Sequence, residues 1–327
     1  MKLSQYLRLS AHLQLMPLLE AGEEILVGGQ AVLEGVMMRA PHSYCVAVRK
    51  PNGELTTQEQ PIPRMSEKYP LFKYPVLRGL GTLGQAMQLG YRALEFSANS
   101  ALEEEPKDGV KAAPQISSTM MAVTMVVNLV LFIAIYKFVP LFLATSLGHV
   151  VPSLSGRFAS NMVDGVIRML LFLAFMFAIS LAKDIHRVFE FHGAEHKVVF
   201  NYESGKPVTV ENAQKFVTFH PRCGTSFVFV LFAIAMVVYA LVPVDGFLVK
   251  FAVRIAMLPV IVGLSYELIR FAAKRQGSLM GWITAPGLWL QRITTKPPDD
   301  TQTAVAIHAL EGAMALEAKQ GGALVIA

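Results

Sequence analysis

The chain has 327 residues, of which 53% are hydrophobic and only 16% are charged, against about 45–50% and about 25% in soluble proteins. This composition excludes an ordinary soluble domain and indicates a membrane protein, so the lipid bilayer is the first expected partner. The net charge of +5 suits an anionic lipid surface, and because no basic run is dense, nucleic acid is not an expected partner.

The amino-terminal third predicts three elements before any membrane span. Residues 1–27 carry a short apolar patch closed by acidic residues, too short to cross a bilayer, which predicts an amphipathic surface helix. Residues 28–62 predict a small antiparallel sheet, because Asn52-Gly53 between extended runs is a strong hairpin signal. Residues 71–105 predict one long helix that packs on the bilayer face or on the spanning helices.

Two features of the predicted sheet have more than one interpretation. Residues 28–30, Gly-Gly-Gln, coincide with the tripeptide that translation termination factors use on peptidyl-tRNA, but glycines entering a strand more often form a turn or bulge. Glu34 lies in an otherwise apolar strand. Its carboxylate is therefore a metal ligand, a buried partner of Arg39 or Arg78, or an outward-facing group.

Four apolar stretches are long enough to cross a hydrocarbon core of about 30 Å as helices. They are residues 112–136, 159–182, 223–243 and 247–271. The fourth stretch contains Pro259 and is expected to be kinked. The apolar residues 277–290 contain tryptophans and helix breakers, which fit an interfacial segment better than a fifth span.

The loops between the predicted spans indicate the orientation. The connections after the first and third spans hold few basic residues, whereas the amino-terminal region, the 183–222 loop and the stretch after Arg270 hold most of the Lys and Arg. The positive-inside rule therefore places both termini in the cytoplasm. A reducing compartment also suits Cys45 and Cys223, which form no disulfide framework.

Residues 183–222 form a cytoplasmic insert between the second and third spans, and they hold the most informative motif. His192 and His196 leave the same face of a helix one turn apart, and Glu195 beside them completes the His-x-x-Glu-His order of the inverted zincins. In those enzymes the carboxylate polarises a metal-bound water. His220 and Cys223 add the imidazole nitrogen and thiolate sulfur that Zn²⁺ prefers.

The motif therefore predicts a divalent metal, Zn²⁺ by preference, held by His192, His196, His220 and Cys223, with Glu195 as the catalytic base. In the plainer alternative the histidines satisfy backbone carbonyls or carboxylates, and Glu195 pairs with Lys197 or Arg222 on a wet surface.

The remaining local patterns concern the insert and the tail. Residues 198–202 and 206–210 predict a hairpin that joins the amino-terminal sheet, and Thr209 predicts the cap of a short helix. In the cytoplasmic tail, residues 291–327, Asp299 and Gln302 predict the cap of a final helix. Asp299 and its neighbour Asp300 are alternative metal ligands, although capping explains them more simply.

The predicted fold class is a membrane α-helical protein with about four transmembrane helices. Its small cytoplasmic α+β portion is built from the amino-terminal hairpin and the 183–222 insert.

Several long blocks of this sequence resemble the YqhQ-like family of bacterial membrane proteins. The blocks are residues 28–39, Ser97-Ala98-Asn99-Ser100-Ala101, His192-Gly193-Ala194-Glu195-His196-Lys197, Thr209-Val210-Glu211-Asn212-Ala213, residues 220–227 and residues 291–300. The family is of unknown function and is often labelled a predicted metal-dependent enzyme. The resemblance covers roughly residues 25–312 and implies a multi-pass protein of the bacterial cytoplasmic membrane, without supplying a reaction.

Two functions are consistent with these patterns. In the first, the protein is a metal-dependent hydrolase at the inner leaflet, acting on a peptide or a small lipid-linked molecule. In the second, Cys223 completes a closed structural metal shell, and the protein is a scaffold or assembly factor for other membrane proteins. Transport is a weaker third reading, since most intramembrane charges lie near predicted helix ends. Those residues are Lys137, Asp164, Arg168, Arg254 and Glu267.

Overall fold

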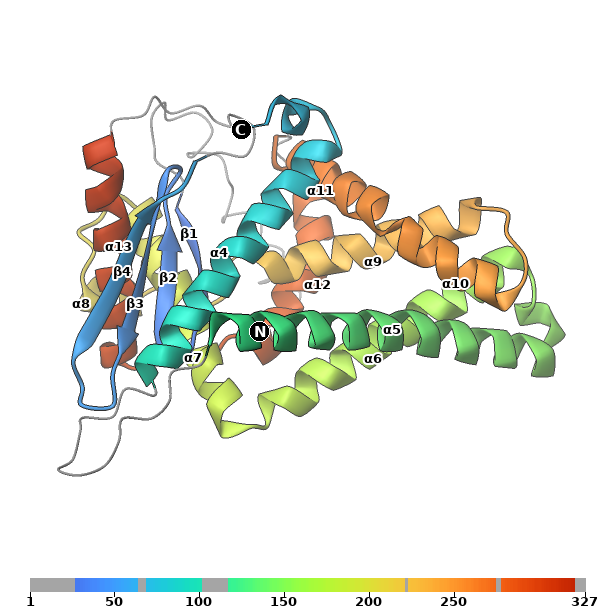
Figure 1. Cartoon of the computed structure of the whole chain (residues 1–327), viewed down its shortest axis with the longest axis horizontal. Helices are drawn as coiled ribbons and strands as arrows, with labels where there is room; N and C mark the ends of the chain where they lie inside the picture. Colours follow the sequence, from blue (N-terminus) through green and yellow to red (C-terminus); the bar gives the residue numbers. More distant parts are fainter. Residues whose placement is uncertain (1–26, 64–68, 102–116, 221–222, 275–277, 321–327) are drawn as a thin grey trace.

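The computed structural model describes residues 27–63, 69–101, 117–220, 223–274 and 278–320. Figure 1 shows a sheet layered with helices at one end of the molecule and long helices that extend away from it. The amphipathic helix predicted over residues 1–27 lies outside the described residues, apart from Val27. The strands are β1 Gly28–Val32, β2 Gly35–Arg39, β3 Ser43–Arg49 and β4 Leu55–Pro61; the helices are η1 Pro70–Lys73, α4 Leu77–Ala101, α5 Ser118–Val150, η2 Pro152–Leu154, α6 Arg157–Ser180, α7 Lys183–Glu203, α8 Val210–Gln214, α9 Gly224–Leu241, α10 Phe247–Ala256, α11 Leu258–Lys274, α12 Ser278–Thr294 and α13 Asp300–Gln320.

The described strands form one antiparallel sheet in the order β1-β2-β3-β4. The hairpin predicted at Asn52-Gly53 is confirmed, because β3 and β4 flank that turn and pair along their whole length. β1 lies at one edge of the sheet and pairs with β2 alone among the described strands.

Glu34 lies in the two-residue turn between β1 and β2 and not inside a strand, which corrects the prediction from the sequence. Its φ of 53° is in the left-handed region, as tight hairpin turns require. Its carboxylate accepts hydrogen bonds from Arg187 of α7, at 2.7 Å from Nη2. The predicted burial against Arg39 or Arg78 is therefore wrong, since both arginines bond to other groups.

The sheet is covered on both faces, by α4 on one side and by α7 and α13 on the other (Figure 1). All of β3 except its last residue is buried, as expected of a strand between two covered faces. Alternate residues of β3 pack into the two separate hydrophobic cores on the opposite faces of the sheet. Val46 and Val48 pack with Leu89 of α4, whereas Cys45 and Ala47 pack against α7 and α13.

The capping predictions are confirmed at two helices. At α13 the Asp299 Oδ1 accepts from the backbone N–H of Gln302 at 2.7 Å, and Gln302 Oε1 accepts from the N–H of Asp299 at 2.9 Å. This reciprocal pair is a capping box. At α8 the Thr209 hydroxyl oxygen accepts from the N–H of Asn212 at 3.2 Å.

The hairpin predicted over residues 198–202 and 206–210 is wrong. α7 continues as a helix to Glu203, and after a short turn the chain enters α8. The β-branched and aromatic residues of this stretch favour a strand locally, but Val198, Val199 and Phe191 are buried in the core beneath the sheet. Tertiary burial therefore outweighs local preference here.

Among the described residues, two helices are long and apolar enough to cross a membrane. They are Ala122–Val150 within α5, and α6. A third candidate is the pair α10 and α11, which meet at a bend of 48°. This bend confirms the predicted kink, and it lies at Met257, just before Pro259.

The sequence predicts four spans, which is more than the two or three candidate spans found among the described residues. α9 occupies the third predicted span, but its apolar part, Phe227–Leu241, is short. α5 also begins later and ends later than the predicted span 112–136. Lys137 therefore lies well inside α5 and not at a helix end.

Candidate metal centre

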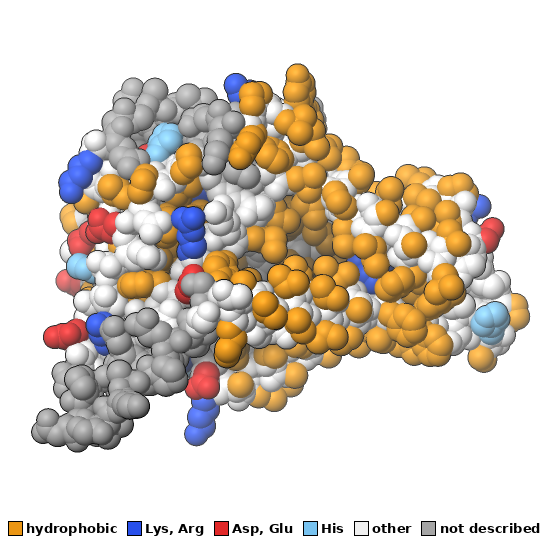
Figure 2. Space-filling view, in the orientation of Figure 1, with side chains coloured by type: hydrophobic (Ala, Val, Ile, Leu, Met, Phe, Trp, Pro, Cys, Tyr) orange, Lys and Arg blue, Asp and Glu red, His pale blue; other side chains and the backbone are white. Residues whose placement is uncertain are grey.

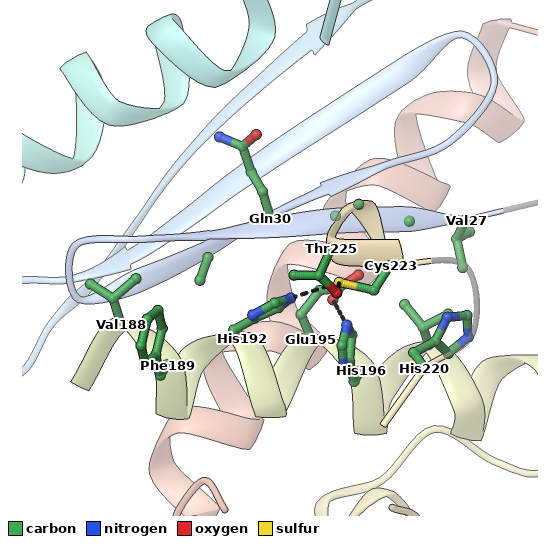
Figure 3. Close-up of a pocket in the computed structure, with 15 residues that line it drawn as sticks. Val27, Gln30, Val188, Phe189, His192, Glu195, His196, His220, Cys223 and Thr225 are labelled. Atoms are coloured by element: carbon green, nitrogen blue, oxygen red, sulfur yellow. Dashed lines mark hydrogen bonds and ion pairs between the residues drawn. The ribbon is translucent and has the colours of Figure 1, made fainter. Parts of the chain in front are cut away.

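α7 carries the predicted motif on the face that it turns towards β1. One cavity receives the side chains of His192, Glu195 and His196, which point into it from the same helix (Figure 3). The two imidazole rings are 4.5 Å apart between centroids, as expected for side chains one turn apart on a helix.

Each histidine is oriented by a backbone carbonyl through its Nδ1 atom. His192 Nδ1 lies 2.8 Å from the carbonyl oxygen of Thr294 at the end of α12, and His196 Nδ1 contacts the carbonyl oxygen of Thr218. A carbonyl only accepts, so each Nδ1 donates, and each Nε2 is left as the acceptor that can bind a metal. Carbonyl partners of this kind commonly support metal-ligating histidines.

Cys223 is the third member of the group. It caps the amino-terminal end of α9, and its Sγ lies 3.3 Å from His192 Nε2. The Thr225 hydroxyl donates to the same sulfur at 3.4 Å. One ligand atom from each of His192, His196 and Cys223 lies within 4.8 Å of the others, which within the described part of the chain is the only such group.

Glu195 lies against this group. Its Oε2 is 3.5 Å from His196 Nε2, and Figure 3 shows its side chain between the two histidines. Glu195 is only 6% exposed, so the wet surface of the plainer alternative is wrong, although both histidines do contact backbone carbonyls as it expected. Lys197, one of its two predicted partners in that alternative, donates instead to the carbonyl oxygens of Gln214 and Phe216, and the other, Arg222, lies outside the described residues.

The structure keeps His220 apart from the other three predicted ligands. Its ring centroid is 5.6 Å from that of His196, and its Nε2 is 3.5 Å from Glu203 Oε2. Its backbone N–H donates to Gln291 Oε1 at 2.7 Å. His220 therefore lines the same cavity without joining the group, and its role as a ligand stays a prediction.

Burial controls the protonation of the inner histidines. Burial, helped by His192, lowers the pKa of His196 to about 4. Burial likewise lowers the pKa of His220 to about 4, with Glu195 opposing the shift. Both rings are thus neutral at physiological pH, the form that can bind a metal.

Gly29 also lines the site, and the sequence alone did not reveal why a glycine is needed at this position. A Cβ on Gly29 would lie 2.9 Å from Cγ of Glu195 and 2.4 Å from the carbonyl oxygen of Met37. Gly28 has nothing within 4 Å of such a Cβ. Gly29 is therefore required by the close approach of β1 to the motif, and not by the turn or bulge that the pattern favours.

The donors fit a metal centre with an open position. Two imidazole nitrogens and one thiolate suit Zn²⁺, and three protein ligands in a tetrahedral shell leave the fourth position for water or substrate. The group opens into a cavity of about 580 Å³ between β1, α7 and the start of α9. Asp299, an alternative ligand in the sequence, is occupied by its capping role.

The comparisons with known proteins place the chain among its relatives. The family described as "Protein of unknown function (DUF1385)" matches residues 74–316. The "Uncharacterized protein YqhQ" of Bacillus subtilis (strain 168) is 34% identical over 304 residues, which is 89% of this chain and 93% of that protein. No solved structure matches. The chain therefore belongs to the DUF1385 family, whose relatives include this YqhQ protein.

Proposed function

We propose that this protein is a metal-dependent hydrolase embedded in the bacterial cytoplasmic membrane. The observation that supports the proposal is the convergence of His192, His196 and Cys223 within 4.8 Å, with the buried Glu195 carboxylate beside them. A divalent metal such as Zn²⁺ held by the three donors would act as a Lewis acid and lower the pKa of water.

In this proposal each residue of the motif has one role. His192 and His196 bind with Nε2, while the carbonyls of Thr294 and Thr218 hold their rings in place. Glu195 serves as the general base that takes the proton from the attacking water. His220 is a further ligand or, from its place in the cavity, a group that contacts substrate.

A peptide is the substrate class that the cavity favours. β1 is an edge strand, and residues 27–31 line the cavity directly beside the motif. Gly28 carries no side chain and has nothing within 4 Å of the place where a Cβ would lie, so an extended chain can approach its backbone closely. Addition of a strand to a sheet edge is a common way to hold a peptide.

The surface of the helices supports placement in a membrane. Figure 2 shows hydrophobic side chains covering the long helices, while charged side chains gather at the sheet end. Large apolar residues such as Val130, Phe142 and Leu170 are more than half exposed, and a patch of this extent calls for a lipid or protein cover.

We also propose four spans with both termini in the cytoplasm. α9 has 18 residues and is about 27 Å long at 1.5 Å per residue, close to the hydrocarbon thickness. With α5, α6 and the bent pair α10 and α11, it makes the fourth span. The basic loops then place the metal centre on the cytoplasmic side.

A scaffold with a structural metal is the second candidate. The group draws its ligands from α7 and α9, and His192 is also tied to the end of α12. A metal there would fasten these helices together. If a fourth protein ligand closed the shell, the metal would contribute to folding and not to catalysis.

Glu195→Gln separates the two candidates. If the metal is catalytic, the variant keeps metal, fold and membrane insertion but fails to complement a deletion strain, because an amide cannot accept the proton. If the metal is structural, the change weakens metal affinity by roughly 10–100-fold.

The measurement pairs complementation with the zinc content of the purified protein. His196→Ala is expected to lose the metal in both cases, and Glu211→Gln, an exposed change in α8, is the control. A Glu195→Gln protein that is fully metallated and fully functional would end the hydrolase proposal.

A further inference from the structure

A cluster of charged side chains lies inside the long helices, separate from the metal centre. Lys137 of α5, Asp164 and Arg168 of α6, and Arg254 of α10 are 6%, 1%, 2% and 3% exposed. Tyr239 of α9 lies among them. All three cationic groups are 5.1–5.5 Å from the centroid of its ring.

This cluster is far from both ends of α6. Arg168 lies near the middle of the helix Arg157–Ser180, so about 17 Å of helix separates it from each end at 1.5 Å per residue. A side chain there cannot reach water by extending along the helix. Intramembrane charges in such positions commonly mark a binding site or an ion pathway.

The charges of the cluster do not balance. Among the described residues that form it, two guanidinium groups and the Lys137 amine face one carboxylate. Both Asp164 oxygens are engaged, Oδ2 by Arg168 Nη2 and Oδ1 by Arg254 Nη1. Lys137 donates at 2.9 Å to the neutral hydroxyl of Tyr239, which itself donates to the carbonyl of Arg254 at 3.0 Å.

Arg168 also holds donors that no described group satisfies. Its Nε and Nη1 are buried without a hydrogen-bond partner. A buried charged donor without a partner is strongly destabilising, and native proteins rarely leave one. Two vacant donors beside an excess of positive charge call for a negative ligand.

We propose that this cluster binds a small anion of the halide class, chloride in the cell, at a vacant nitrogen of Arg168. One of the three N–H donors of Lys137 is used by Tyr239, which leaves others for an anion in this cluster. The full burial of the Arg168 nitrogens favours a monatomic ion over an oxyanion or a lipid phosphate, because the larger groups need more room and more donors. The inference is independent of the hydrolase proposal.

The test measures the stability and ion binding of the full chain in detergent. The unfolding midpoint of the wild-type protein is expected to rise with chloride concentration when gluconate replaces it at constant ionic strength. The protein is also expected to retain about one radioactive chloride per chain at saturation. Arg168→Gln should lose both effects. Arg157→Gln, an exposed change at the start of the same helix, should keep them.

Two results would overturn the proposal. One is a wild-type protein that binds no chloride and has the same midpoint in chloride and gluconate, and this result does not depend on any variant folding. The other is stabilisation by phosphate but not by chloride, which would assign the site to oxyanions.

Discussion

At the scale of single residues, the two cysteines have opposite surroundings. Cys45 is fully buried in β3, and burial, with Glu59 adding to it, raises the pKa of its thiol to about 12. Cys223 is partly exposed and contacts His192. Reactivity requires the thiolate, so only Cys223 is expected to be reactive, and only when no metal protects it.

The corresponding prediction concerns maleimide labelling at neutral pH. After treatment with a chelator, one thiol per folded chain should react, and Cys223→Ser should abolish the reaction while Cys45→Ala leaves it unchanged. Before chelation the labelling of Cys223 should be slow, because a coordinated thiolate is occupied. A Cys223→Ser protein with full metal stoichiometry and affinity would refute the role of this thiol.

A second residue-scale prediction compares adjacent glycines. Gly29→Ala forces a Cβ against Met37 and Glu195, so it should cost about 1–3 kcal/mol of unfolding free energy as overpacking does, and weaken metal binding by displacing Glu195. Gly28→Ala meets open space and should be close to neutral. Urea unfolding and zinc titration check both variants. Equal behaviour of the pair would mean that β1 does not press on the motif.

At the scale of the elements, α13 is fastened to the sheet by Glu317. Its Oε2 accepts from the N–H of His42 at 2.9 Å and from the hydroxyl of Ser43 at 2.7 Å, and its Oε1 lies 2.8 Å from His42 Nδ1. Burial raises the pKa of this carboxyl, but the hydrogen bonds from Ser43 and His42 outweigh it, and the net pKa is below the usual value of 4.5.

The lowered pKa of Glu317 makes the stability of the protein depend on pH. A carboxyl whose pKa is lower in the folded state stabilises the protein above its unfolded pKa, and this stabilisation is lost as the pH falls from about 4.5 through the folded value. Glu317→Gln should cost about 1.5–3 kcal/mol at pH 7, as hydrogen bonds to a charged group do, and reduce the loss of stability below pH 4.5. Urea unfolding between pH 7 and 3 tests this, with the exposed Glu311→Gln on the same helix as control. Identical pH curves for Glu317→Gln and wild type would contradict it.

At the scale of the whole molecule, the distribution of side chains predicts the topology. Charges gather at the sheet end and apolar side chains cover the helices (Figure 2). Ser155 lies in the turn between α5 and α6, and Ser204 follows α7; both are exposed. The proposed four-span arrangement puts these two sites on opposite sides of the membrane.

Cysteine-accessibility labelling in intact cells tests this arrangement. An impermeant thiol reagent should label Ser155→Cys from outside, and should label Ser204→Cys only after the membrane is opened. The wild-type chain, labelled in parallel, accounts for the two native thiols. Reaction of Ser204→Cys from the periplasmic side alone would contradict the proposed topology.

Local patterns in the sequence determined the features that depend on residues close in the chain. The capping box of Asp299 and Gln302, the Thr209 cap and the Asn52-Gly53 hairpin each rest on contacts within a few residues. Spacing alone likewise put His192 and His196 on one face of a helix, because helical geometry relates positions four apart. The long, mostly apolar stretches of α5 and α6 indicated helices able to cross a membrane, because length and composition are read directly from the sequence.

Only the tertiary structure decided which distant side chains meet. His220 and Cys223 are three residues apart, yet only Cys223 joins the group, because the start of α9 directs its sulfur to His192. Asp164 and Arg254 are 90 residues apart and share one buried cluster. From the sequence alone, each was expected to lie near a helix end. Such pairings depend on how helices pack, and helix packing is set by complementary surfaces that no short stretch of sequence contains.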